Sequence, residues 1–173
     1  MRWNIGLCLL GSLFISSAGA RISSVPIEDL IATTDAIVIA KVTELLPTSS
    51  DKGDLVYASA SVQKTLKGKL SGSFMFMASA GWVCDSSGAI KDETALFFLG
   101  HADNGMYYID MAGRGRMPFR EVEGKTYVTL WDEVILPKDA PLIAGPDARY
   151  TFIRSVELSY IEGLIRKHQR AAN

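Results

Sequence analysis

The stretch Leu55-Val-Tyr-Ala-Ser-Ala-Ser-Val-Gln-Lys-Thr-Leu66 alternates between apolar and polar side chains. Small or branched apolar residues occupy every second position from Val56 to Val62, and hydroxyl- or amide-bearing residues fill the positions between them. A period of two places successive side chains on opposite faces of a strand. We therefore expect residues 55–66 to form an antiparallel strand with one buried and one exposed face.

Four further runs predict strands around this one. Residues 36–45 begin apolar at every position, which is typical of a strand covered on both faces. Asn104-Gly105 indicates a tight hairpin, since both residues tolerate positive φ. The remaining predicted strands are residues 74–80, 94–99 and 106–111, and an extra hairpin joins residues 117–122 to 126–131 across Glu123-Gly124.

Five consecutive short strands without βαβ alternation predict a mainly β fold. The best match in strand number and length is a five-stranded barrel of the oligonucleotide/oligosaccharide-binding (OB) type, and the alternative is a two-sheet sandwich.

Two helices flank the predicted strands. Residues 26–32 suit a short helix that Ser23 or Ser24 caps, with acidic residues in its first turn. Residues 155–167 place apolar side chains on one helical face, which we expect to close one end of the barrel. The C-terminal end of this helix is basic, as the helix dipole favours.

The first 20 residues have the pattern of a secretory signal. Arg2 precedes a short apolar run, and Ala18-Gly19-Ala20 provides the small residues that a signal peptidase requires. The alternative is an amphipathic or buried helix. We expect cleavage after Ala20, a secreted or periplasmic location, and a single domain over residues 21–173. No later segment is long and apolar enough to span a membrane.

Charge argues against a nucleic-acid partner, because the formal net charge is −1 at pH 7. The run Gly113-Arg114-Gly115-Arg116 lacks the ending of a phosphate-binding loop. With Arg120, Tyr107 and Tyr108 it could form a basic aromatic face for nucleic acid. A flexible hairpin with solvated charges is the favoured interpretation.

Cys84 is the single cysteine that remains after signal removal, since Cys8 lies within the signal. We expect a free thiol in a loop, structural, idle or joined to another molecule by a disulfide. The alternative is a cysteine nucleophile with His101 as base and Asp103 or Asp110 as orienting group. Neither a metal site nor a cofactor is expected. Phe74, Met75, Phe76 and Met77 are interpreted as core rather than as a ligand pocket.

Several segments resemble netrin-module domains, whose best-known members are the tissue inhibitors of metalloproteinases. Thr34-Asp35-Ala36-Ile37-Val38-Ile39-Ala40-Lys41-Val42 is similar to their opening strand, and residues 62–68 resemble a second strand that ends in a basic residue and glycine. Residues 95–100 resemble a later strand, and Cys84 falls where that family has a cysteine. Small exported bacterial proteins without assigned function share this series.

The resemblance implies an OB-like fold and a binding role. Those inhibitors act through an N-terminal cysteine, whereas the predicted mature chain begins at Arg21, so inhibition is not implied. The sequence thus predicts an exported, non-enzymatic binding or interaction domain with a protein or envelope partner. The alternative is a Cys84-dependent hydrolase or redox protein.

Overall fold

The computed structural model describes residues 23–48, 55–79, 87–144 and 154–171. The predicted signal and Cys84 lie outside the described residues. The elements in chain order are β1 (Val25–Pro26), α1 (Ile27–Thr33), β2 (Ala36–Thr48), β3 (Leu55–Lys67), β4 (Ser73–Ser79), β5 (Thr94–His101), β6 (Tyr107–Ile109), β7 (Arg116–Val122), β8 (Lys125–Leu130), β9 (Val134–Ile135), β10 (Ile143–Ala144), β11 (Arg154–Glu157) and α2 (Leu158–Ala171).

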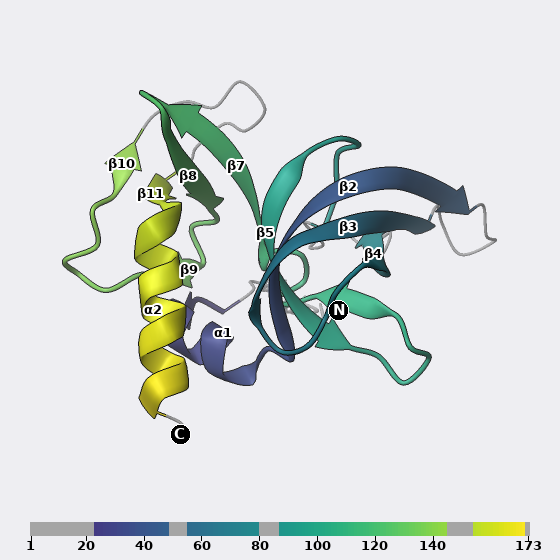
Figure 1. Ribbon diagram of the computed structural model, residues 1–173, viewed down its shortest axis with the longest axis horizontal. Coiled ribbons are helices and arrows are strands. Elements are labelled where there is room, and N and C mark those ends of the chain that lie inside the picture. Colours follow the sequence, from purple (N-terminus) through teal and green to yellow (C-terminus); the bar gives the residue numbers. More distant parts are fainter. Residues whose placement is uncertain (1–22, 49–54, 80–86, 145–153, 172–173) are drawn as a thin grey trace, which may run out of the picture.

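Five strands close into a barrel in the order β2, β3, β4, β6, β5 and back to β2 (Figure 1). Every neighbouring pair is antiparallel except β4 and β6, which run parallel. β6 joins the two open edges, because it pairs with β4 through Phe76 and Met77 and with β5 through Leu99–His101. The predicted five-stranded OB-like barrel is therefore confirmed, and the sandwich alternative is wrong.

Two hydrophobic cores share strands β2 and β5. Val38 on β2 and Phe97 on β5 point into the barrel, whereas their neighbours Ile37 and Phe98 point to a second core outside it. All four side chains are fully buried. The prediction that residues 36–45 begin as a strand covered on both faces is thus confirmed, and the second core explains why.

The sheet continues beyond the barrel from β5 through β7, β8, β11 and β10 (Figure 1). The second core lies between this part of the sheet and helices α1 and α2. The predicted hairpin is confirmed as β7–β8, and its turn has positive φ at Glu123 (51°) and Gly124 (75°). None of the helices in the described ranges is long and apolar enough to cross a membrane.

Helix α2 differs from its prediction in its bounds, since it ends at Ala171 rather than at residue 167, and in the core that it covers. Residues 155–157 belong to strand β11, which pairs with β8, so the helix begins at Leu158. Its buried residues Ile161 and Ile165 join the second core rather than the barrel interior. The helix therefore covers the outer core and does not close an end of the barrel.

Helix α1 begins without a side-chain cap. Its N-cap residue is Pro26, so the prediction that Ser23 or Ser24 caps it is wrong. The reason is that Val25 and Pro26 pair with β9, and the chain enters the helix directly from this strand.

The C-terminal end of α1 is held by Lys67 from the end of β3. The Lys67 ammonium donates to the carbonyl oxygens of Ile31 (2.6 Å), Ala32 (2.9 Å) and Thr34 (2.6 Å). Gly68 follows with φ +81°, and a Cβ there would lie 2.7 Å from the Asp35 carbonyl oxygen. The basic residue and glycine that end β3 thus fix the position of the α1–β2 junction.

Candidate functional site

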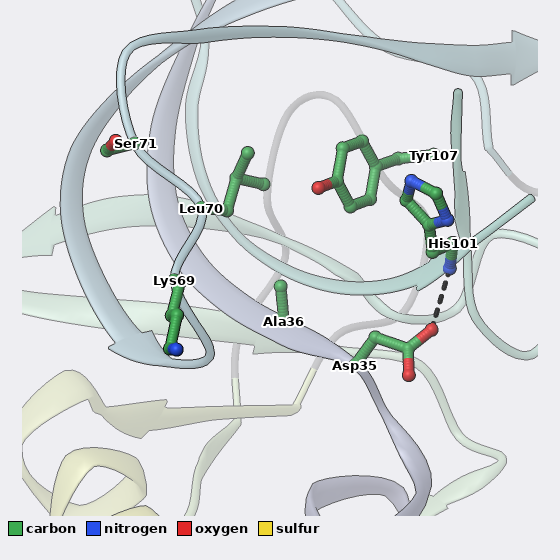
Figure 2. A pocket seen from close by; sticks show the side chains of 7 residues that line it. All are labelled: Asp35, Ala36, Lys69, Leu70, Ser71, His101 and Tyr107. Atoms are coloured by element: carbon green, nitrogen blue, oxygen red, sulfur yellow. Dashed lines mark hydrogen bonds between the residues drawn. The ribbon is translucent and has the colours of Figure 1, made fainter. Parts of the chain in front are cut away.

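A pocket of about 420 Å³ opens at the barrel end next to the α1–β2 junction (Figure 2). Three separate segments form it: the start of β2, the β3–β4 connection and the two ends of the β5–β6 hairpin. Its lining residues are Asp35, Ala36, Lys69, Leu70, Ser71, His101 and Tyr107.

The pocket has an apolar floor and a polar rim. Ala36 is buried, and Leu70 and Tyr107 are half-buried and pack against the barrel core. The rim residues Asp35, Lys69, Ser71 and His101 are exposed. Floor and rim of this kind suit a partner that inserts an apolar group and makes hydrogen bonds around it.

The rim contains an aspartate, a histidine and a serine, but they are not linked as a catalytic relay. Asp35 Oδ2 accepts a hydrogen bond from the main-chain N–H of His101 (2.8 Å) and not from its imidazole (Figure 2). The imidazole stands edge-on to the Tyr107 ring, with centroids 5.1 Å apart. Figure 2 shows Leu70 between Ser71 and Tyr107. A nucleophile, base and orienting acid in hydrogen-bond contact are required for such a relay.

No hydrogen bond or ion pair joins His101 to Asp103 or Asp110, the residues predicted as partners of Cys84, in the described part of the chain. His101 ends β5, Asp103 is exposed in the hairpin turn, and Asp110 follows β6. The Asp110 carboxylate accepts a hydrogen bond from the Thr34 hydroxyl (2.6 Å). Burial raises the pKa of Asp110, and the nearby Asp35 charge adds to this effect, whereas the Thr34 hydrogen bond opposes it. Through this hydrogen bond Asp110 joins the chain after β6 to the α1–β2 junction.

The arginines of residues 113–116 are engaged inside the molecule. Arg114 lies over the Trp131 ring, 5.9 Å from its centroid, and pairs with Glu133 (3.3 Å). Arg116 is buried and donates to both carboxylate oxygens of Glu93 (2.8 Å each). Both sequence interpretations of this segment are therefore corrected, because these two charges are neither solvated nor arranged toward a nucleic acid.

A second feature is the outer wall of the barrel, formed by Tyr57, Ser59, Met75, Met77 and Tyr108 on β3, β4 and β6. Phe74 and Phe76 face the barrel core as predicted, but the prediction that Met75 and Met77 are core is wrong. Met75 is 44% exposed and Met77 half-buried on the opposite face of β4.

No family model matches this chain, and no curated protein matches it either. The resemblance to netrin-module domains therefore stays a prediction. Within the ranges that the structure describes, no three His, Cys, Asp or Glu side chains gather in a group that could hold a metal ion.

The sequence did not single out the pocket. Lys69 and Ser71 read as ordinary turn residues, and Asp35 as part of a strand opening. Asp35 meets the turn that holds Lys69 and Ser71 because β2 pairs with β3 up to Ile37 and Lys67, and β6 adds Tyr107 beside His101.

Proposed function

We propose that this chain is an exported, non-enzymatic binding domain that recognises another protein of the cell envelope through the barrel-end pocket. The observation that carries the proposal is the pocket's apolar floor within an exposed rim of Asp35, Lys69, Ser71 and His101. Protein interfaces concentrate their binding energy where an anchoring side chain fills such a depression.

The arrangement of the rim supports binding rather than turnover. Asp35 is oriented by a main-chain N–H, and within the described residues neither Ser71 nor His101 makes a hydrogen bond that would activate a nucleophile. Lys69 and Asp35 give the rim one charge of each sign, and neither forms an ion pair in the described part of the chain. A partner that carries complementary charges around an apolar anchor would satisfy both.

The test is recovery of a partner from the envelope fraction with the mature chain as bait. We expect Lys69→Glu to reduce recovery of a specific protein at least tenfold, because it reverses one rim charge. Lys138→Glu is the matched control, since it makes the same charge change at an exposed residue outside the pocket. Equal recovery by both variants would overturn the assignment of the pocket.

The same preparation separates binding from the cysteine-dependent alternative. Cys84→Ser leaves the pocket residues unchanged, so we expect partner recovery to persist. A turnover panel that found hydrolysis or thiol exchange lost in Cys84→Ser would favour an enzyme instead.

A further inference from the structure

The sheet beyond the barrel has a polar face on the side opposite the second core. Val128 on β8 and Val156 on β11 lie opposite one another in the ladder, and both belong to the second core. Successive side chains of a strand point to opposite faces, so Thr129 and Ser155, which also lie opposite one another, share the other face. Thr129 is 4% exposed and Ser155 is fully buried. Two hydroxyl groups on neighbouring strands are therefore shielded from solvent.

Neither of these hydroxyl groups has a hydrogen-bond partner within the described part of the chain. Buried polar groups in folded proteins are almost always hydrogen-bonded, and a group that stays unpartnered costs free energy. Valine and alanine would fill the positions of Thr129 and Ser155 without that cost. The two hydroxyls therefore indicate a partner that the described residues do not supply.

Arg120 on β7 brings a positive charge to the same face. It lies opposite Tyr127, two positions from Thr129 on β8, and a long side chain can reach such a diagonal neighbour. Its Nη1 atom is buried without a hydrogen-bond partner, and no ion pair compensates its guanidinium among the described residues. Glu157, which lies opposite Tyr127 on β11, is paired with Lys125 (3.1 Å). The charge of Arg120 is thus left without a carboxylate.

Arg116 shows how the same face accommodates another buried arginine. It lies four positions before Arg120 on β7, which places both side chains on one face. The Glu93 carboxylate accepts two hydrogen bonds from Arg116 (2.8 Å each). A buried charge is costly unless an opposite charge compensates it. Since no carboxylate of the described ranges pairs with Arg120, an anionic partner is favoured there over a neutral one.

We propose that Arg120, Thr129 and Ser155 bind one small oxyanion, a carboxylate or a phosphate. One guanidinium N–H and two hydroxyl groups supply three donors, and the oxygens of such an anion supply only acceptors. Arginine is the side chain that carboxylate and phosphate recognition uses most. A water molecule would satisfy the hydroxyls but would leave the guanidinium charge uncompensated. None of the three residues lines the barrel-end pocket, so this site is separate from it.

The test is isothermal titration calorimetry of the purified chain with sodium acetate and, separately, with sodium phosphate, in chloride buffers of equal ionic strength. We expect saturable binding in at least one of the two titrations, which identifies the ligand as a carboxylate or a phosphate. Thr129→Val and Ser155→Ala should each weaken this binding at least tenfold, because each removes a hydrogen bond to a charged group. Thr126→Val is the matched control, since Thr126 lies on the other face of β8 and its hydroxyl donates to Glu121 (2.7 Å).

Thermal unfolding in the same buffers separates lost binding from misfolding. Without the anion, Thr129→Val should unfold at a higher temperature than the native chain, because it removes an unpartnered buried hydroxyl and keeps the side-chain shape. With the anion at saturation, it should unfold at a lower temperature, because the native chain binds the anion more tightly.

Three results would overturn the proposal. The first is the lack of saturable binding in both titrations. The second is binding that Thr126→Val weakens as much as Thr129→Val does. The third is a Thr129→Val variant that is less stable than the native chain with and without the anion, since its hydroxyl would then have a permanent partner. None of these results bears on the pocket, because every variant leaves the pocket residues unchanged.

Discussion

Replacing Lys67 by methionine should destabilise the whole fold. The ammonium of Lys67 donates three hydrogen bonds to carbonyl groups at the end of α1, and two of these bonds are partly buried. Hydrogen bonds to charged groups contribute about 1.5–3 kcal/mol each, but water can replace the exposed one and part of the others. We therefore expect a loss of about 2–3 kcal/mol in the free energy of unfolding.

The assay is urea unfolding followed by circular dichroism. With a slope of about 2 kcal/mol per molar urea, the midpoint should fall by about 1–1.5 M. Lys64→Met is the matched control on the same strand, because Lys64 is 55% exposed and forms an ion pair with Glu162. An exposed pair contributes at most about 1 kcal/mol. Equal midpoints for the two variants would refute the role given to Lys67.

Three other changes follow from the described contacts. Gly68→Ala should lower the midpoint of thermal unfolding more than Gly72→Ala does. Both glycines have positive φ, but only at Gly68 would an added Cβ press against main-chain atoms. Equal decreases in the midpoint would contradict this. Glu93→Gln should lower the free energy of unfolding by about 3–5 kcal/mol, because the buried Arg116 charge loses the Glu93 carboxylate. Adding Arg116→Met should restore part of that free energy in urea titration. A double variant no more stable than Glu93→Gln would show that the buried charge is not the cause. Asp110→Asn should raise the thermal midpoint near pH 7, because the raised pKa of Asp110 means that ionisation destabilises the fold. That gain should shrink as the pH falls toward the ordinary carboxyl value of 3.8, where the native side chain is neutral, and a gain constant with pH would refute it.

Much of the barrel could be predicted because its strands differ in periodicity. The alternation in residues 55–66 appears as β3, with Ala58 and Ala60 inside the barrel. The apolar start of β2 has both faces covered, as its composition indicates. Local turn chemistry was equally informative at Gly105, whose φ is +81°.

Other features could not be predicted because they depend on contacts distant in the sequence. The sequence places residues 155–157 at the start of the last helix. In the structure they belong to β11, because residues 154–157 pair with β8. Met75 and Met77 resemble core residues by composition, and only the burial of Phe74 and Phe76 shows which face of β4 turns inward. Lys67-Gly68 could be recognised in the sequence as the end of a strand. That Lys67 donates hydrogen bonds to the end of α1 follows only from the position of α1 beside the end of β3.

The pocket illustrates the same limit. Its residues come from three segments, and each is unremarkable in its local sequence. The arginines of residues 113–116 are the converse case, because a local pattern suggested a ligand site whereas Trp131, Glu133 and Glu93 engage them inside the fold. Side-chain chemistry therefore indicated candidate groups, and the topology decided which of them meet.

The central claim is that the barrel-end pocket contacts a protein partner, and photocrosslinking in intact cells tests it most directly. A photoreactive residue at Ser71, on the pocket rim, should give one discrete adduct that Lys69→Glu abolishes. The same residue at Ile135, exposed on β9, should give no adduct of that mass. An adduct at Ser71 that persists in Lys69→Glu, or that forms equally from Ile135, would contradict the account.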